Sequence, residues 1–409
     1  MSARESETII WEFISLDEYS KPPGTIEESV KMGFLRFRNI LRRTGSQKSV
    51  ISKENLTGFP KNRLDRIVPT PDWQSAVEAF LICLAGWITD PAKENNILFV
   101  LKPPYSQTDL VLQKFAKQQQ WMILNPPKFD QILENDTSWI TESESILSHP
   151  FVLPNLEKCF LKHYNGLKLI RQLFWYLWSN PCQAIIGVDS WAWAFLKRAI
   201  EIDAFGRKTV ISKPLDHKRL EIWLQSLTKY HIKRKLTFRK TNDGTFVLKP
   251  LFELDESNPP KVDYKLLRNL AHYSEGIPGV LWAFWRSLLR IVPEDELFLR
   301  DDFDSEAEVK KSTIWVIPWE KLSLPSFIEG IDRKELFVLH LLLIHNGMSS
   351  SLLSQILPLS PPELLQTLNM LRKASLIEIN DDNEWNILPI AYPFVKELLG
   401  MKGYLTDGL

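Results

Sequence analysis

The chain has 409 residues, and its 50 Lys and Arg balance 50 Asp and Glu to give a formal net charge of zero. Apolar residues make up 44% and charged residues 24%, which excludes a disordered chain and gives no global electrostatic reason to expect nucleic acid or an acidic membrane as partner. Its three cysteines form no CxxC pair, so neither a disulfide framework nor a structural zinc site is expected.

No part of the sequence resembles a membrane or export segment. Residues 1–10 are polar and unlike a signal peptide. The longest apolar runs, Ala79–Ile88 and Leu336–Ile344, are far shorter than the roughly 18 residues of a membrane span. We therefore expect a cytoplasmic protein without a membrane partner.

The first 66 residues are polar, and we expect an N-terminal extension with a helix over 26–41. Beyond them, unbroken apolar runs of strand length alternate with segments whose apolar residues recur at helical spacing. The expected strands are 97–101, 121–124, 184–189 and 209–212, and the expected helices are one opened by Pro69–Asp72 and those over 109–119, 155–178, 191–202 and 216–228. This alternation predicts an α/β fold with a parallel sheet covered by helices on both faces.

The second half changes character. Asn242-Asp243-Gly244 between two alternating segments, 236–240 and 245–249, is a strong hairpin signal. Two helices, 263–274 and 280–291, are expected next, followed by an acidic linker over 294–329. Residues 330–409 then give three helical patterns and a hairpin: 332–344, 349–357, 360–374, and 376–379 with 385–388. Three helices closed by a two-stranded wing predict a winged-helix domain.

The loop between the first expected strand and its helix is the most informative segment. A P-loop NTPase holds its nucleotide at this place, and from Lys102 to Asp109 the chain reads KPPYSQTD. It resembles the AAA+ and STAND families of ATPases, whose loop commonly reads GPPGSGKT. Both prolines and Ser106 are retained, whereas the three glycines are replaced by Lys102, Tyr105 and Gln107, the lysine by Thr108, and the magnesium-binding hydroxyl residue by Asp109.

These replacements oppose phosphate binding. Glycines let the backbone amides converge on the anion, and Tyr105 and Gln107 carry side chains where a positive φ or a close approach is expected. Asp109 adds a negative charge at a helix N-terminus that would otherwise attract phosphate. No glycine lies between Gly86 and Gly166, so no other register restores the motif. We expect no bound nucleotide, no metal and no other cofactor.

The resemblance assigns roles to other residues. Asp189 stands where a Walker B aspartate would bind magnesium, although capping the following helix is an alternative role, and Ser212 stands at a sensor position. It implies an AAA+-like domain over 67–255, a helical lid over 256–293 and the winged helix over 330–409. The same order of domains occurs in origin-recognition-type AAA+ proteins.

Charge is unevenly distributed. Between residues 205 and 250, twelve Lys and Arg oppose three carboxylates, a net charge of +9, while residues 294–308 carry eight carboxylates and one arginine. A basic patch of this kind can bind phosphates or match an acidic protein segment. The candidate patch contains Arg207, Lys208, Lys233, Arg234, Lys235, Arg239 and Lys240. Residues 331–409 carry six basic and nine acidic residues, which opposes DNA binding by the winged helix.

Eight of the fifteen tryptophans lie in short clusters, among them Trp175 with Trp178 and Trp282 with Trp285. Filling the core is the expected role, and an exposed stacking or interface patch is the alternative. From these observations the sequence predicts a catalytically inactive AAA+-like scaffold or regulatory protein with protein partners. A nucleic-acid-binding regulator using residues 205–250 and an atypical NTPase are the alternatives.

Overall fold

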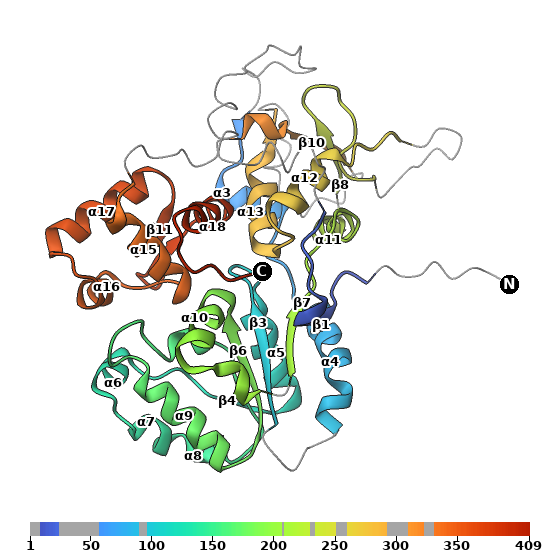
Figure 1. Cartoon of the computed structure of the whole chain (residues 1–409). Coiled ribbons are helices and arrows are strands. Elements are labelled where there is room, and N and C mark those ends of the chain that lie inside the picture. The colour runs from blue at the N-terminus through green and yellow to red at the C-terminus, as the bar shows by residue number, and fades with distance from the viewer. Residues whose placement is uncertain are drawn as a thin grey trace.

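The computed structural model describes residues 9–23, 57–89, 96–206, 208–229, 234–250, 260–292, 310–322 and 331–409 (Figure 1). The helix expected over 26–41 and the acidic residues 294–308 lie outside this described part. No helix of the described residues is long and apolar enough to cross a membrane.

A six-stranded sheet forms the centre of the lower unit in Figure 1. Its strands lie in the order β1-β7-β3-β6-β5-β4, and every neighbouring pair is parallel except β1 with β7. The bounds are β1 Phe13–Ser15, β3 Asn96–Lys102, β4 Met122–Ile123, β5 Phe151–Leu153, β6 Gln183–Asp189 and β7 Lys208–Ser212. Counted along the chain, the five parallel strands therefore have the order 5-1-4-3-2, and the fold is α/β as expected.

Helices cover both faces of this sheet. Phe99 of β3 packs against Phe174 of α9 and Trp193 of α10 on one face, and Phe80 of α4 contacts Phe115 of α5 on the other. The helices of the unit are α4 Gln74–Thr89, α5 Thr108–Gln119, α6 Phe129–Glu134, α7 Ser138–Glu142, α8 Glu144–Leu147, α9 Lys168–Ser179 and α10 Ser190–Ile200, with the 3-10 helices η1 Leu16–Glu18, η3 Leu156–Lys158 and η4 Ile202–Phe205.

The prediction of one helix over 155–178 is wrong for its first half. Strand β5 precedes it, and α9 begins only at Lys168. Between them the chain turns tightly: the amide of Leu161 donates to the carbonyl of Gly166 at 3.0 Å, and a Cβ on Gly166 would lie 2.3 Å from the carbonyl oxygen of Leu161. A helix cannot pass through such a turn.

A second sheet lies in the upper unit, with four strands in the order β2-β9-β10-β8 (Figure 1). Its strands are β2 Thr57–Gly58, β8 Arg234–Lys240, β9 Leu289–Ile291 and β10 Lys310–Val316. Strand β8 pairs in parallel with β10, a partner that the sequence did not indicate. The expected hairpin is present only near its turn, where Arg239 bridges Phe246 and the amides of Val247 and Lys240 donate to the carbonyls of Phe238 and Thr245, each at 2.9 Å. Strand β10 also lies within the range expected as a linker.

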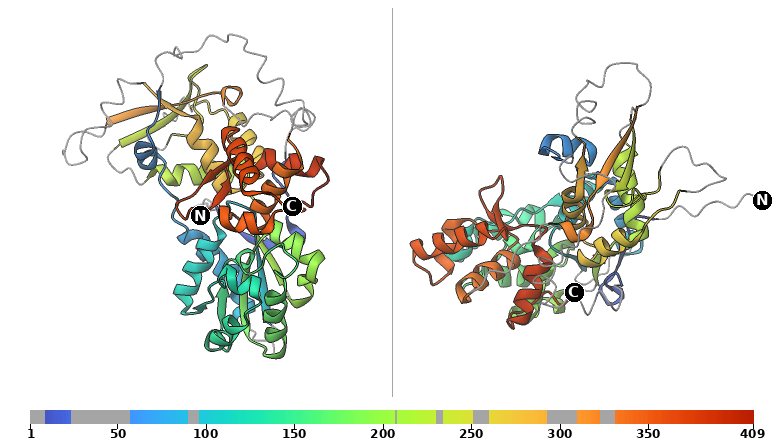
Figure 2. Two further views of the ribbon diagram at one scale, coloured as in Figure 1. Left: turned by 90° about the vertical axis from the view of Figure 1, so that its left-hand side faces the viewer. Right: turned by 90° about the horizontal axis from the view of Figure 1, so that it is seen from above.

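The remaining helices complete the upper unit and the C-terminal unit. They are α3 Lys61–Ile67, α11 His217–Lys229, α12 Lys265–Tyr273, α13 Pro278–Leu288 and η5 Trp319–Lys321, followed by α15 Arg333–Ile344, α16 Ser350–Ile356, α17 Pro361–Lys373 and α18 Tyr392–Met401. Strands β11 Ile377–Ile379 and β12 Trp385–Ile387 form an antiparallel pair before α18. The C-terminal helices, red in Figure 2, lie against both other units.

Candidate functional site

The loop between β3 and α5, residues 103–107, lies at the carboxyl edge of the parallel sheet, where open α/β sheets bind ligands. Tyr105 and Gln107 have φ of 65° and 59°. This left-handed conformation costs a residue with a side chain roughly 1–2 kcal/mol and is free for glycine. The loop thus carries side chains at two positions where glycine would be free of strain.

Tyr105 connects this loop to two other units. Its carbonyl accepts a hydrogen bond from the amide of Gly279, at the start of α13, at 2.9 Å. Its hydroxyl donates to the carbonyl of Ile387 in β12, and its ring meets that of Tyr392 edge-on with 5.8 Å between centroids. Position 279 must be glycine, since a Cβ there would lie 2.4 Å from the carbonyl oxygen of Tyr105. Burial raises the pKa of the Tyr105 hydroxyl, which therefore stays protonated as a donor.

The other polar residues of the loop bond locally. The amide of Ser106 donates to the carbonyl of Pro103 at 3.0 Å, and the Thr108 hydroxyl donates to Ser106 Oγ at 2.9 Å. Ser106 and Thr108 are both buried, while Asp109 lies in the first turn of α5.

Lys102, the last residue of β3, is buried and fully satisfied. Its ammonium donates to Glu157 Oε1 at 2.9 Å, to Asn155 Oδ1 at 2.5 Å and to the carbonyl of Pro154 at 2.7 Å. A lysine has three N–H donors, so none is left for a ligand in this arrangement. The carboxylate of Glu157 has no exposed surface, and its other oxygen accepts the amide of Asp189 at 3.1 Å. Sequence reasoning missed Glu157 because it placed this residue inside a long helix.

Asp189, at the end of β6, caps the next helix. Its Oδ1 accepts the amide of Trp191 at 2.9 Å. Burial, together with the neighbouring Glu157 carboxylate, raises the pKa of Asp189 well above its usual value. Because β5 precedes it, β6 is the fourth parallel strand along the chain and lies directly beside β3.

The segment after α18 returns over this edge of the sheet. The Asp407 side chain is fully buried and accepts hydrogen bonds from Ser190 Oγ at 3.1 Å, from the Tyr392 hydroxyl at 3.2 Å and from the Lys396 ammonium. Lys396 also pairs with Glu275 at 2.8 Å. Burial alone would lower the pKa of Lys396, but the two carboxylates outweigh it and raise that pKa. Neither Lys396 nor Asp407 belongs to a motif, so no sequence pattern indicated this contact.

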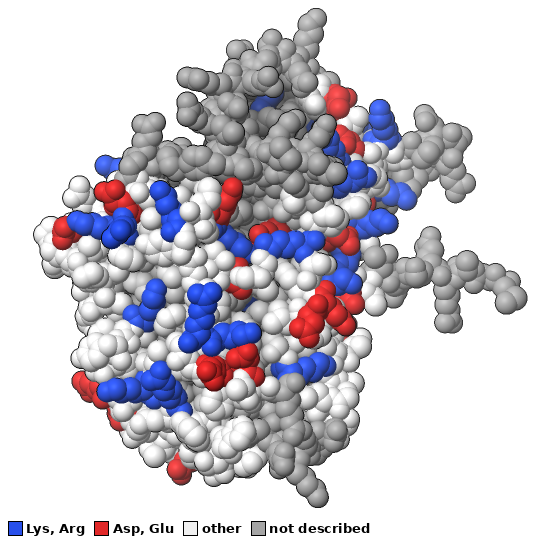
Figure 3. Space-filling view, viewed as in Figure 1, with Lys and Arg blue, Asp and Glu red and all other residues white. Residues whose placement is uncertain are grey.

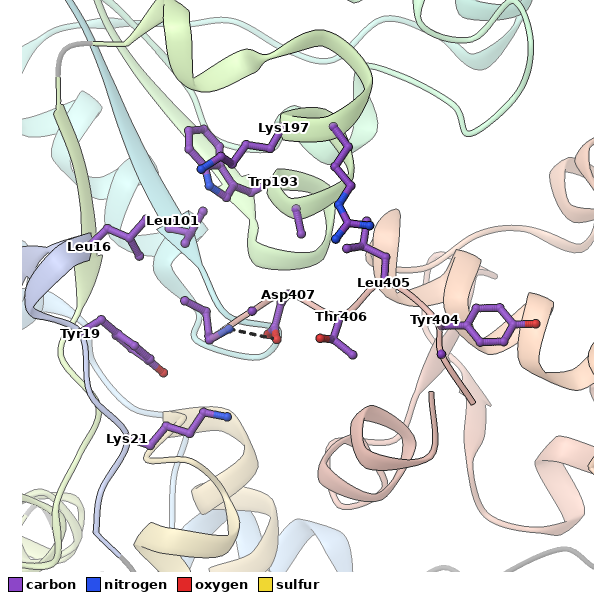
Figure 4. Close-up of a pocket in the computed structure, with 15 residues that line it drawn as sticks. Leu16, Tyr19, Lys21, Leu101, Trp193, Lys197, Tyr404, Leu405, Thr406 and Asp407 are labelled. Carbon is purple, nitrogen blue, oxygen red and sulfur yellow. Dashed lines mark hydrogen bonds between the residues drawn. The ribbon is translucent and has the colours of Figure 1, made fainter. Parts of the chain in front are cut away.

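A cavity of about 750 Å³ remains beside this segment (Figure 4). Leu16 and Tyr19 line one side, Trp193 and Lys197 of α10 line another, and Asp407 lies between them, while the Tyr404 ring points away. The cavity is lined by both hydrophobic and charged side chains.

Two histidines join the C-terminal unit to the loop after β5. His345 accepts the amide of Lys162 at 3.2 Å on Nε2, so its Nδ1 donates to the carbonyl of Glu157 at 3.2 Å. His340 Nδ1 faces the Lys162 ammonium at 3.2 Å, and its Nε2 faces the carbonyl of Leu405. Burial is the main cause that lowers the pKa of His340 to about 4 and that of His345 to about 3.

The expected basic patch is divided between two sheets. Lys208 is exposed at the start of β7, whereas Arg234, Lys235, Arg239 and Lys240 belong to β8; Arg207 and Lys233 lie outside the described residues. Arg239 stacks over the Phe246 ring at 4.1 Å, and Lys240 pairs with Asp263. On the face seen in Figure 3, basic and acidic side chains are interspersed.

Ser212 ends β7 and pairs with Phe13 of β1.

Within the described ranges no group of three or more His, Cys, Asp or Glu side chains could hold a metal ion.

No protein-family model matches the chain, and no curated protein matches it either. Among solved structures, it is similar to the Holliday junction branch migration motor RuvB of Thermotoga maritima, with 11% identity and a TM-score of 0.31 over 81% of this chain and 95% of that one. Cdc6p from Pyrobaculum aerophilum has 12% identity and a TM-score of 0.30 over 83% of this chain and 98% of that one. Because both TM-scores are low, the α/β fold is assigned from the strand order of the sheet and not from these similarities.

Proposed function

We propose that this chain is a catalytically inactive AAA+-like scaffold or regulatory protein that acts through protein–protein contacts. The observation that carries the proposal is the internal use of the β3–α5 loop. Lys102 donates three hydrogen bonds to other groups of the chain, and Tyr105 forms hydrogen bonds that connect the loop to α13 and β12. A triphosphate would have to displace these contacts. Its negative charge would also meet the carboxylate of Asp109 in the first turn of α5, where a cation would be needed to bind it.

The carboxylates of this edge support the same proposal. The Asp189 carboxylate caps α10, and Glu157 neutralises Lys102. Asp407 lies against Ser190, the position next to the Walker B-like aspartate. To bind magnesium, Asp189 would have to give up its hydrogen bond to the amide of Trp191 and become ionised beside Glu157. The raised pKa of Asp189 opposes this ionisation.

In this proposal residues 67–255 form the AAA+-like domain, residues 256–293 the lid and residues 330–409 a winged helix. The order α15, α16, α17 and the β11–β12 hairpin supports the last assignment. The hairpin tip carries the exposed Asp381 and Asp382, which would repel DNA phosphates. We therefore assign the winged helix to protein contacts, with no cofactor and no membrane partner.

Equilibrium binding of a fluorescent ATP analogue with magnesium tests the proposal. We expect no saturable binding up to about 1 mM nucleotide, a limit of roughly −4 kcal/mol. Micromolar affinity that is lost in Thr108→Ala or Asp109→Ala would refute it. ATP turnover that disappears in Asp189→Asn would instead establish the NTPase alternative.

A further inference from the structure

The outer face of α9 carries side chains that the core does not use. Trp175 is 65% exposed and Trp178 is 53% exposed, although both were expected in the core. Arg171 and Lys168 precede them at helical spacing, and Tyr164, just before the helix, is 83% exposed. We name these five residues the α9 stripe.

The α9 stripe is not needed to hold the helix in place. The opposite face buries Leu169, Ile170, Leu173, Phe174 and Leu177 against the sheet. Tryptophan is on average a highly buried residue, so two that lie more than half exposed on one helix face are unusual. Tryptophan, tyrosine and arginine are also the residues that dominate binding energy at protein interfaces.

The positive charges of the α9 stripe have no carboxylate partner within the described ranges. Arg171 donates to the backbone carbonyl of Ala199 at 3.2 Å, and neither Arg171 nor Lys168 forms an ion pair there. A partner that fits this surface therefore carries negative charge next to exposed apolar side chains.

The same chain presents such a surface. At the end of the β11–β12 hairpin, Asp381 and Asp382 are exposed and Ile379 is 43% exposed. Neither aspartate forms an ion pair within the described part of the chain. We name these three residues the acidic tip. It and the α9 stripe are both exposed in one molecule, so they do not cover each other within it.

We propose that the α9 stripe binds the acidic tip of a second copy of this chain. Charge complementarity selects this occupant: two cations and three aromatic rings face two carboxylates and an isoleucine. Because the two surfaces differ, the contact is head-to-tail, and an open assembly has one free stripe at one end and one free tip at the other. The inference rests on the proposed role in protein contacts and names one partner for it.

Sedimentation velocity over a concentration series tests this contact with the full chain. We expect the average mass of the unmodified protein to rise with concentration beyond a dimer and to fall with added salt. A stripe variant, Arg171→Ala with Trp175→Ala, and a tip variant, Asp381→Lys with Asp382→Lys, should each weaken self-association at least about tenfold. A matched control, Leu365→Ala with Lys402→Glu, changes an exposed apolar and an exposed basic residue elsewhere and should associate normally.

Mixing the two variants gives the sharpest outcome. The stripe variant retains its tip and the tip variant retains its stripe, so an equimolar mixture should form a one-to-one dimer and grow no further. An unmodified protein that stays monomeric, variants that assemble like it, or a mixture that stays monomeric would overturn the proposal. So would a monomer whose stripe binds anionic vesicles or single-stranded DNA instead.

This test and the nucleotide test fail independently. Assembly could be absent in a protein that still binds no ATP, and ATP binding could be found in a protein that assembles through the α9 stripe. Circular dichroism of each variant checks that it is folded, which is expected because every changed residue is exposed or half-exposed.

Discussion

The carboxyl edge of the sheet, which we call the closed edge, differs from the outer face of α9. Its polar and aromatic groups are buried and bonded within the chain, whereas those on α9 are exposed. At the edge, Lys102 and Glu157 are buried and neutralise each other, and Tyr105 bonds to the chain itself. On α9, Arg171 lacks a carboxylate partner among the described residues, and Trp175 lies in solvent. The first region resembles a ligand site in position only, whereas the second has the composition of a binding surface.

This difference shows that position in a fold and capacity to bind are separate properties. A parallel sheet offers a crevice at its carboxyl edge whatever its residues are. Binding also requires donors, acceptors or apolar surface that are not already used within the chain. By that criterion, α9 rather than the β3–α5 loop is the place to look for a partner of this protein.

Breaking the ion pair between Lys102 and Glu157 at the closed edge should have the largest effect on stability. Glu157→Gln keeps the shape of the side chain and leaves Lys102 charged without its counterion, so we expect a loss of about 3–5 kcal/mol in the free energy of unfolding. Urea denaturation followed by circular dichroism measures it. The double variant Lys102→Met with Glu157→Leu removes both charges and should cost less than the single one. A cost below about 1 kcal/mol for Glu157→Gln would mean that this pair is not isolated from solvent.

The sequence predicted the central features of the closed edge. A positive φ or a close approach was expected at Tyr105 and Gln107 from the register with a glycine-rich loop, and both residues have a positive φ. The parallel strands 97–101, 184–189 and 209–212 were predicted almost to the residue, since a strand buried on both faces is an unbroken apolar run.

Other features could not be predicted because they depend on distant contacts. Strand β5 has only three residues, Phe151–Leu153, and an apolar run this short between Pro150 and Pro154 does not distinguish a strand from part of a helix. The parallel partner of β8, Lys310–Val316, pairs with residues 76 positions earlier in the chain, beyond the reach of any turn signal. The exposure of Trp175 was missed because helical spacing says which residues share a face and not which face is covered.

Acid should weaken the contacts between the C-terminal unit and the loop after β5. His340 and His345 have pKa values lowered from 6.5 to about 4 and about 3, so the folded protein keeps them neutral while the unfolded chain takes up protons below pH 6.5. Their contribution is complete above pH 6.5 and is lost as the pH falls toward 4 and then 3. At pH 5 this amounts to about 2 kcal/mol for each histidine.

Urea denaturation at pH 7, 6 and 5 measures this loss. His340→Gln keeps a donor and an acceptor on the side chain and removes the titration, so its stability should fall less steeply between pH 7 and pH 5. An equal slope in this variant would show that His340 does not carry its share of the pH dependence.

Tyr105→Phe should have a smaller effect on the closed edge. The change removes one hydroxyl and leaves the carbonyl of Ile387 without its donor, which costs about 1 kcal/mol. The ring and the carbonyl contact with Gly279 remain, so the fold should persist. Thermal unfolding should show a slightly lower midpoint. If Tyr105→Phe acquired micromolar affinity for ATP, the hydroxyl contact alone would be what keeps nucleotide out.

Trp175→Ala should have the smallest effect on stability and is the direct counterpart of the changes above. Trp175 is 65% exposed, whereas Trp191 is 1% exposed, so we expect a change within about 0.5 kcal/mol for Trp175→Ala and a loss of about 3–5 kcal/mol for Trp191→Ala. Urea denaturation at a dilution where the protein is monomeric measures both. A loss above about 2 kcal/mol for Trp175→Ala would mean that this ring holds α9 in the fold, and the α9 stripe would then be part of the core rather than a surface kept for a partner.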